Sequence, residues 1–194
     1  MRGTTTIANL RQHRDYAPSL LLPPYQRGIV WSPDQVLTLV DSAERGFALG
    51  QLMLWEVYEE GGRKQYVIDG QQRLAALTGR RAGDSHNTWT VYFDVDAQVW
   101  TLDEPKRGIP LWMDSFSDEL DRFDEIGGLR DPKVMSAIRR RDAVHSCWNF
   151  PTYVIEHATA DDVALMFLRL NTGGTPLDAK LIEWLRGQTK KPNP

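Results

Sequence analysis

The chain has 194 residues, of which 41% are hydrophobic and 25% are charged, as is usual for a globular protein with one hydrophobic core. Its formal net charge of −3 excludes a protein that coats nucleic acid through an overall positive field. The single cysteine, Cys147, excludes an internal disulfide and a multi-cysteine metal site. Because no apolar run is long enough to span a membrane, we expect a cytoplasmic protein without membrane contact.

Three segments are expected along the chain: an N-terminal arm over 1–17, one domain over 18–187 and a polar tail over 188–194. The first clear element of the domain is a helix that starts at Ser32-Pro33-Asp34-Gln35. There Ser32 supplies the N-cap, proline occupies the first helical position, and Gln35 closes a capping box. Apolar residues then recur at helical spacing until Gly46, which predicts the end of this helix.

Several strands are predicted in the middle of the chain. In residues 51–58, apolar side chains would lie on both faces of a strand, which indicates a buried strand. The sequence Glu59-Glu60-Gly61-Gly62 predicts a turn into a second strand at 65–68, so that the two strands form a hairpin. Regular alternation over 89–95 predicts a strand with one buried face, paired with a short strand at 98–102.

The second half of the chain contains a stretch without a clear pattern, 103–130, followed by further elements. The pattern predicts a helix over 132–145, a strand over 151–156, and two helices that start at Thr159 and Thr175. In the helix over 132–145, Arg139-Arg140-Arg141 is expected on a solvated face, with contact to DNA as the alternative. Strands and helices are mixed without strict alternation, which predicts an α+β fold with a small mixed β-sheet and packed helices.

The most informative stretch joins the strand at 65–68 to a helix-like run through a polar turn, Asp69-Gly70-Gln71-Gln72-Arg73. A helix that starts after such a turn has unpaired backbone N–H groups and the positive end of its dipole there, so it attracts anions. Glycine allows the backbone to approach a ligand closely. The turn thus concentrates a carboxylate, two amides and a guanidinium where an anion would bind.

Two interpretations of this turn stay open. In the functional one, Arg73 and the N–H groups bind phosphate, Asp69 holds a metal ion or orients a water, and Gln71 and Gln72 contact ribose, base or that water. In the structural one, Asp69 caps the helix and Arg73 forms a surface ion pair of little energetic value.

Two other stretches are candidates for the same site. Tyr25-Gln26-Arg27 and Trp31 could form a second wall, with Arg27 on phosphate and an aromatic ring on a base. Alternatively the aromatic residues belong to the core and Arg27 is solvated. Asn171, followed by Thr172-Gly173-Gly174, could contact ligand through its amide or could simply belong to a helix C-cap.

The turn Asp69–Arg73 after a strand resembles the signature of the GmrSD restriction endonuclease N-terminal domain family, also called domain of unknown function 262. Three further stretches agree with this family in order and spacing, and the resemblance spans roughly residues 15 to 187. They are the Pro-x-Tyr-Gln-Arg-x-x-x-Trp box in Leu22–Trp31, the Gly-led strand Gly50–Trp55, and the stretch Phe167–Leu177. The last is similar to the family's Phe-x-x-x-Asn-x-Gly-x-x-Leu box, with one residue more before the leucine.

The resemblance implies a fold and a ligand. The family is similar to the ParB N-terminal and sulfiredoxin fold, in which a small mixed sheet holds a nucleotide beside a Gly-x-x-Arg turn, here Gly70–Arg73. Gln71 replaces the cysteine that sulfiredoxin chemistry needs. The implied activity is an Mg²⁺-dependent nucleoside triphosphatase, with Asp69, Gln72 and Arg73 catalytic, Asp69 on the metal, and Tyr25, Gln26, Arg27, Gly70, Gln71 and Asn171 binding the nucleotide.

A different class of function stays open beside this one. The family acts in restriction and anti-phage defence, so the domain could be a non-catalytic module that senses modified DNA or regulates a partner nuclease. Members that act as full restriction nucleases carry a C-terminal HNH-type nuclease domain. Because the sequence stops at Pro194, we expect no such domain here, so the chain would need a separate nuclease subunit as partner or would act as a decoy, a regulator or a truncated remnant.

Overall fold

A computed structural model describes residues 2–23, 28–59, 62–84, 86, 88–113 and 115–171. Its larger sheet has four strands in the order β1-β7-β2-β3. Their bounds are β1 Arg2–Thr6, β2 Leu52–Glu59, β3 Gly62–Asp69 and β7 Thr152–Glu156. The sheet is mixed, because β2 and β7 run parallel whereas the other neighbouring strands are antiparallel.

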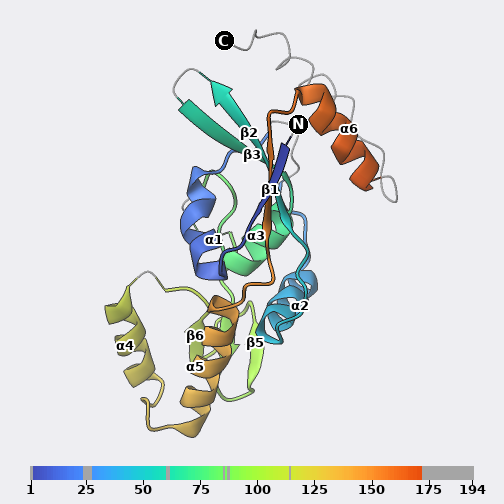
Figure 1. Cartoon of the computed structure of the whole chain (residues 1–194). Coiled ribbons are helices and arrows are strands. Elements are labelled where there is room, and N and C mark those ends of the chain that lie inside the picture. Colours follow the sequence, from blue (N-terminus) through green and yellow to red (C-terminus); the bar gives the residue numbers. More distant parts are fainter. Residues whose placement is uncertain are drawn as a thin grey trace.

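A second, antiparallel sheet and six helices complete the described part of the chain. This sheet has the order β5-β4-β6, with β4 Tyr92–Asp94, β5 Val99–Thr101 and β6 Gly108–Pro110. The helices are α1 Leu10–Tyr16, α2 Pro33–Glu44, α3 Gln71–Thr78, α4 Phe116–Glu125, α5 Pro132–His145 and α6 Ala160–Asn171, with a 3-10 turn η1 at Ala17–Ser19. Figure 1 shows the β2–β3 hairpin at one end of the molecule and α4, α5 and the second sheet at the other.

The two faces of the larger sheet pack against different helices because side chains alternate along each strand. Leu52 and Leu54 of β2 belong to one continuous core that includes residues of α1, α3, α2 and α5 and of the second sheet. Met53 and Trp55 point the other way and pack with Val163 of α6. The expected α+β fold with a mixed sheet is confirmed, and the likeness of its core to ParB or sulfiredoxin stays a prediction.

Elements with strong local signals lie where the sequence predicts them. Helix α2 has the expected capping box between Ser32 and Gln35 and proline in its first turn. Strands β2 and β3 form the predicted hairpin, and β4 pairs with β5. Helix α5, strand β7 and the start of α6 also agree with the pattern. The helix expected after Thr175 and the tail over 188–194 lie outside the described residues.

The first 17 residues differ from the expected arm. Strand β1 pairs with β7 at the edge of the sheet, and α1 is closed by a capping box between Asn9 and Gln12. Leu10 and Ala17 are fully buried in the core. The segment lacks an apolar alternation because all five residues of β1 are exposed and only their backbone joins the sheet. The unreadable stretch 103–130 likewise contains β6 and α4.

The basic run on α5 is a correction to the sequence-based expectation of a solvated face. Arg139 is exposed, but Arg141 is buried and pairs with Glu119 of α4. The Arg140 Nη2 donates to Glu44 of α2 at 2.9 Å, and its guanidinium lies over the Phe93 ring. Two of the three arginines therefore tie α5 to its neighbours instead of facing solvent.

Within the described ranges, no helix is both long and apolar enough to cross a membrane.

Two buried histidines make the fold sensitive to acid. Arg11 donates to Nδ1 of His145, so the proton of the neutral ring is on Nε2, which donates to the Leu111 carbonyl at 2.6 Å. Burial lowers the pKa of His145 to about 3, and nearby arginines, Arg141 first, act in the same direction. Burial also lowers the pKa of His13 from its ordinary value.

Stability should therefore fall when the pH drops below about 6.5, because the unfolded chain then binds a proton that the folded protein excludes. For His145 the loss is about 1.4 kcal/mol per pH unit until the pH nears its folded pKa of about 3. Urea unfolding between pH 7 and 5, where carboxyl groups change little, measures this slope. His145→Gln should give a shallower slope than the wild type. Equal slopes for the two proteins would contradict the assignment.

Candidate functional site

The candidate site is the turn between β3 and α3, and its shape depends on Gly70. This residue has φ +95°, in the left-handed region that favours glycine. A Cβ atom at Gly70 would lie 2.9 Å from the carbonyl oxygen of Gln51 and 3.2 Å from the Cα of Leu52. The turn therefore packs directly on the start of β2, and α3 begins at the next residue, Gln71.

The N-cap of α3 is Gly70, which has no side chain that could cap the helix. Among the described residues, no side chain accepts a hydrogen bond from the first N–H groups of α3. Asp69 is thus not the N-cap, so the structural interpretation is wrong in assigning the helix cap to Asp69. A helix start without such a cap, at the positive end of the helix dipole, suits an anion.

Asp69 and Arg73 form an ion pair across the first turn of α3. The Nη2 of Arg73 lies 2.7 Å from Oδ2 of Asp69 and also donates to the Gln51 carbonyl at 3.0 Å. A Cβ atom at Gly50 would lie 3.4 Å from the guanidinium, so this group rests on the glycine. The Arg73 side chain is 27% exposed and that of Asp69 48%. The Arg73 guanidinium is only partly exposed, because the backbone before β2 holds it in place.

Gln72 connects this turn to a second stretch of the predicted site. Its amide oxygen accepts from the N–H groups of Val30 and Trp31, at 3.0 and 3.3 Å, and its amide nitrogen donates to the Gly28 carbonyl. On the N-terminal side of Tyr25-Gln26-Arg27, Leu21 forms an isolated parallel β-bridge with Tyr66 of β3. The segments on both sides of Tyr25-Gln26-Arg27 are therefore held near β3 and α3, while the box itself lies outside the described residues.

These contacts give Gln72 a positioning role for the loop at 28–31. A catalytic role for Gln72 stays a prediction, and it requires that the amide release one of these backbone partners. Trp31 packs against the core, as the structural interpretation of that residue expects. Asn171 is the last residue of α6, and the position of its side chain lies outside the described part of the structure.

Gln71 is the unusual residue of the turn. It is 4% exposed, and neither its amide oxygen nor its amide nitrogen has a hydrogen-bond partner among the described residues. Buried polar groups nearly always have partners, because an unpaired one costs about 1–3 kcal/mol. At the start of α3, this amide therefore needs a partner that the described residues do not supply.

The turn fits Mg²⁺ only as an ion carried by phosphate. The described residues contain no group of three or more histidine, cysteine or acidic residues that could hold a metal ion. Asp69 supplies the one carboxylate of the turn, and it already pairs with Arg73. Mg²⁺ is commonly held by one or two carboxylates together with substrate phosphates and water. Asp69 could therefore hold Mg²⁺ only as one ligand of an ion that phosphate also binds.

Sequence analysis did not assign a role to Gly50 and Gln51, although both contact the Arg73 guanidinium. A signal was present, because Gly50 leads one of the stretches that carry the family resemblance. Its φ of +78° explains why glycine is found there.

Comparison with models of known protein families found one match. Residues 7–180 match the family model described as GmrSD restriction endonuclease, N-terminal domain. The match covers most of the chain, so the chain belongs to this family. A search of curated proteins found no match.

Replacing Gly70 tests the packing of the turn. Gly70→Ala should lower the free energy of unfolding by about 1–3 kcal/mol, because alanine is strained at positive φ and its Cβ meets the Gln51 carbonyl. Gly28→Ala is the matched control, since a Cβ there has nothing within 4 Å. Urea unfolding of both variants measures the difference. Equal stabilities of the two would show that the turn does not need glycine.

Proposed function

We propose that this domain binds a nucleoside triphosphate together with its Mg²⁺ at the turn Asp69–Arg73. The observation that carries the proposal is the start of α3, where the described residues supply neither a side-chain cap nor a partner for the Gln71 amide, and where the Arg73 guanidinium lies beside them. All three features are supplied within five consecutive residues. Together they offer N–H donors and positive charge to one anion.

The chemistry of this turn matches phosphate better than a carboxylate or a neutral ligand. Phosphate oxygens accept from backbone N–H groups at a helix start, where the dipole adds attraction. A guanidinium has five N–H donors, and the two contacts of Arg73 that hold it in place both use Nη2. Arg73 can therefore keep its pair with Asp69 and still donate a charge-assisted bond to phosphate.

The other predicted residues complete the nucleotide site in this proposal. Arg27 would give phosphate a second cation, and Tyr25 would stack on the base, with Gln26 and Asn171 as further polar contacts. The Gln72 amide supports this arrangement, because its bonds to 28–31 hold the segment after Arg27 beside α3.

After binding, the same residues would catalyse hydrolysis of the triphosphate. Asp69 would orient a water toward the terminal phosphate, and Arg73 would stabilise the negative charge that develops there. Mg²⁺ bound to the phosphates would neutralise further charge, with the Asp69 carboxylate as its protein ligand. The domain would then act as a nucleotide-dependent part of a restriction or anti-phage defence system, with a separate nuclease as partner.

The rival function, recognition of modified DNA without catalysis, has less support. It relied on Arg27 and on the run at 139–141 for contacts with the DNA backbone. Arg140 and Arg141 are engaged by Glu44 and Glu119, which leaves Arg139 as the exposed arginine of the run. The nucleotide proposal is therefore favoured.

Calorimetric titration with the four ribonucleoside triphosphates and Mg²⁺ tests the proposal. The wild type should bind at least one of them. Arg73→Ala should weaken that binding by about tenfold or more, because a charge-assisted bond is worth about 1.5–3 kcal/mol. Its unfolding free energy should fall by about 1 kcal/mol or less.

Two controls separate site from scaffold. Arg45→Ala removes the Asp41–Arg45 pair on α2, which has the same i,i+4 spacing, and should leave binding unchanged. Leu74→Ala removes a fully buried side chain of α3, so it should destabilise by roughly 2–5 kcal/mol while the folded protein still binds. A folded wild type that binds no triphosphate, or an Arg73→Ala variant that binds like wild type, would refute the proposal.

A further inference from the structure

The four-stranded sheet has one covered edge and one open edge. At the β3 edge, Leu21 donates to the Gln65 carbonyl and accepts from the Val67 N–H, both at 2.9 Å. At the opposite edge, β1 pairs with β7 on its inner side, and no described residue pairs with its outer side. Edge strands are usually protected by proline, lysine or a bulge, because they can pair with another chain. The five exposed residues of β1 include neither of these residue types, and the register with β7 has no bulge.

Strand register shows which backbone groups of β7 point toward β1. The Leu52 N–H donates to the Pro151 carbonyl, and Leu52 is the partner of Thr152 in the parallel pair of β2 and β7. In a parallel pair, a residue bonds to the two neighbours of its partner. The backbone groups of odd-numbered residues of β7 therefore point toward β2, and those of even-numbered residues point toward β1.

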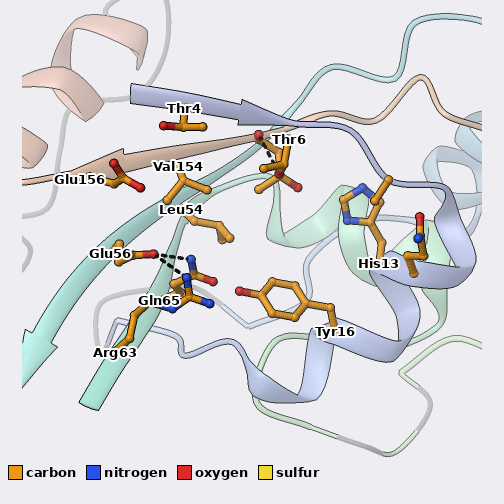
Figure 2. A pocket seen from close by; sticks show the side chains of 13 residues that line it. Thr4, Thr6, His13, Tyr16, Leu54, Glu56, Arg63, Gln65, Val154 and Glu156 are labelled. Carbon is orange, nitrogen blue, oxygen red and sulfur yellow. Dashed lines mark hydrogen bonds and ion pairs between the residues drawn. The ribbon is translucent and has the colours of Figure 1, made fainter. Parts of the chain in front are cut away.

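The open edge consists of the backbone groups of Gly3 and Thr5. Even-numbered residues of β7 are opposite even-numbered residues of β1, so Thr4 and Thr6 use their N–H and C=O groups toward β7. Gly3 and Thr5 alternate with them and direct their N–H and C=O groups outward. The side chains of Thr4 and Thr6 line a cavity between the sheet and α1 (Figure 2). The Thr5 side chain is therefore on the opposite face, toward α6.

Gly3 leaves room for a tyrosine at this edge. The φ of Gly3 is not positive, so its backbone does not require glycine. A Cβ atom at Gly3 would clash with the hydroxyl of Tyr153, which is opposite Thr5 on β7 and packs with the apolar cluster under α6. The Tyr153 ring thus leans across Gly3, and its hydroxyl has no hydrogen-bond partner among the described residues. Glycine weakens a strand and often marks a place where another backbone approaches closely.

We propose that β1 pairs antiparallel with β1 of a second copy of this chain, about a two-fold axis at Thr4. Gly3 of each copy then lies opposite Thr5 of the other, and each such pair exchanges both of its N–H···O bonds. The Thr5 side chain of the second copy stands opposite Gly3, where its hydroxyl bonds to Tyr153. An extended segment of any protein could bond to the open backbone. Only a segment with a hydroxyl opposite Gly3 also pairs Tyr153, and β1 itself supplies it.

The remaining side chains of β1 are compatible with this pairing. Thr4 lies opposite Thr4 of the second copy, and threonine pairs are favourable across antiparallel strands. Arg2, the charged residue of β1, lies opposite Thr6 of the second copy, so like charges do not face each other. Because such short strands bury little area, the dimer should be weak, with a dissociation constant in the micromolar to millimolar range. The interface contains none of the turn residues and so goes beyond the proposed function.

Analytical ultracentrifugation of the full chain from micromolar to millimolar concentration tests the proposal. The wild type should change from monomer to dimer as its concentration rises. Thr5→Pro removes an outward N–H and should weaken association about tenfold or more, while the urea midpoint of the monomer stays nearly unchanged. Thr4→Pro is the matched control, because it removes an N–H that bonds to β7 and should lower that midpoint. Tyr153→Phe removes the hydroxyl alone and should weaken association by about threefold or more.

Cysteine cross-linking tests the register. Thr4→Cys places two cysteines opposite each other in a non-hydrogen-bonded pair, with Cα atoms about 4.5 Å apart, which is within the range of a disulfide. Arg2→Cys is equally exposed, but its two copies would lie roughly 14 Å apart across the axis. Under mild oxidation, Thr4→Cys should therefore form a covalent dimer at least about tenfold faster than Arg2→Cys.

Three results would overturn the proposal. The first is a folded wild type that stays monomeric at millimolar concentration. The second is a dimer that persists unchanged in the folded Thr5→Pro and Tyr153→Phe variants, and the third is equal cross-linking of Thr4→Cys and Arg2→Cys. If Thr5→Pro unfolds, Tyr153→Phe and the cross-linking decide. These measurements contain no nucleotide, so their failure leaves the nucleotide proposal standing.

Discussion

The close contact between the Gly70 backbone and the start of β2 is the constraint on which the site depends. Left-handed geometry at Gly70 lets β3 pass directly into α3. A Cβ atom at this position would lie only 2.9 Å from the Gln51 carbonyl oxygen. Because the helix begins there, Arg73 reaches the backbone of Gln51 and Gln72 reaches the loop at 28–31. One glycine thus aligns three segments that are distant in sequence.

The same turn leaves its own polar groups incompletely paired. Helix α3 is anchored by Leu74 and Leu77, which are fully buried, rather than by a cap at its start. Apolar burial therefore stabilises a helix whose first turn has no side-chain cap, and whose buried Gln71 amide has no partner, among the described residues. A ligand that accepts hydrogen bonds and carries negative charge would supply the missing partners of the N–H groups at the start of α3. This division between an anchored end and an open end is what we expect of a binding site.

Local chemistry made much of this fold predictable. The sequence Ser32-Pro33-Asp34-Gln35 contains everything that a helix start needs, and α2 starts there. The polar turn after an apolar strand likewise located the β3–α3 junction and its candidate ligands. The family boxes indicated that Tyr25–Arg27 belongs near this turn, and Gln72 shows how the flanking loop is attached, although the roles of those residues stay predictions.

Features that depend on distant partners could not be predicted from local patterns. Strand β1 is exposed along its whole length and exists because its backbone pairs with β7, at the far end of the chain. Arg141 looked solvated because its helix has a polar face, but Glu119, its partner, is on α4, in a stretch without a legible pattern. The pairing of Gln65 with Glu56 was also hidden, because only strand register places the two side chains next to each other.

Hydrogen exchange at the amides of Gln71, Gln72 and Arg73 tests the central claim most directly, because these N–H groups are the proposed phosphate donors. With a saturating nucleoside triphosphate and Mg²⁺, their exchange should slow by about tenfold or more. The first turn of α2, which Ser32 already caps, should not change. Exchange at Gln71–Arg73 that stays the same with nucleotide present, in a protein that is folded, would contradict the claim that this turn binds phosphate.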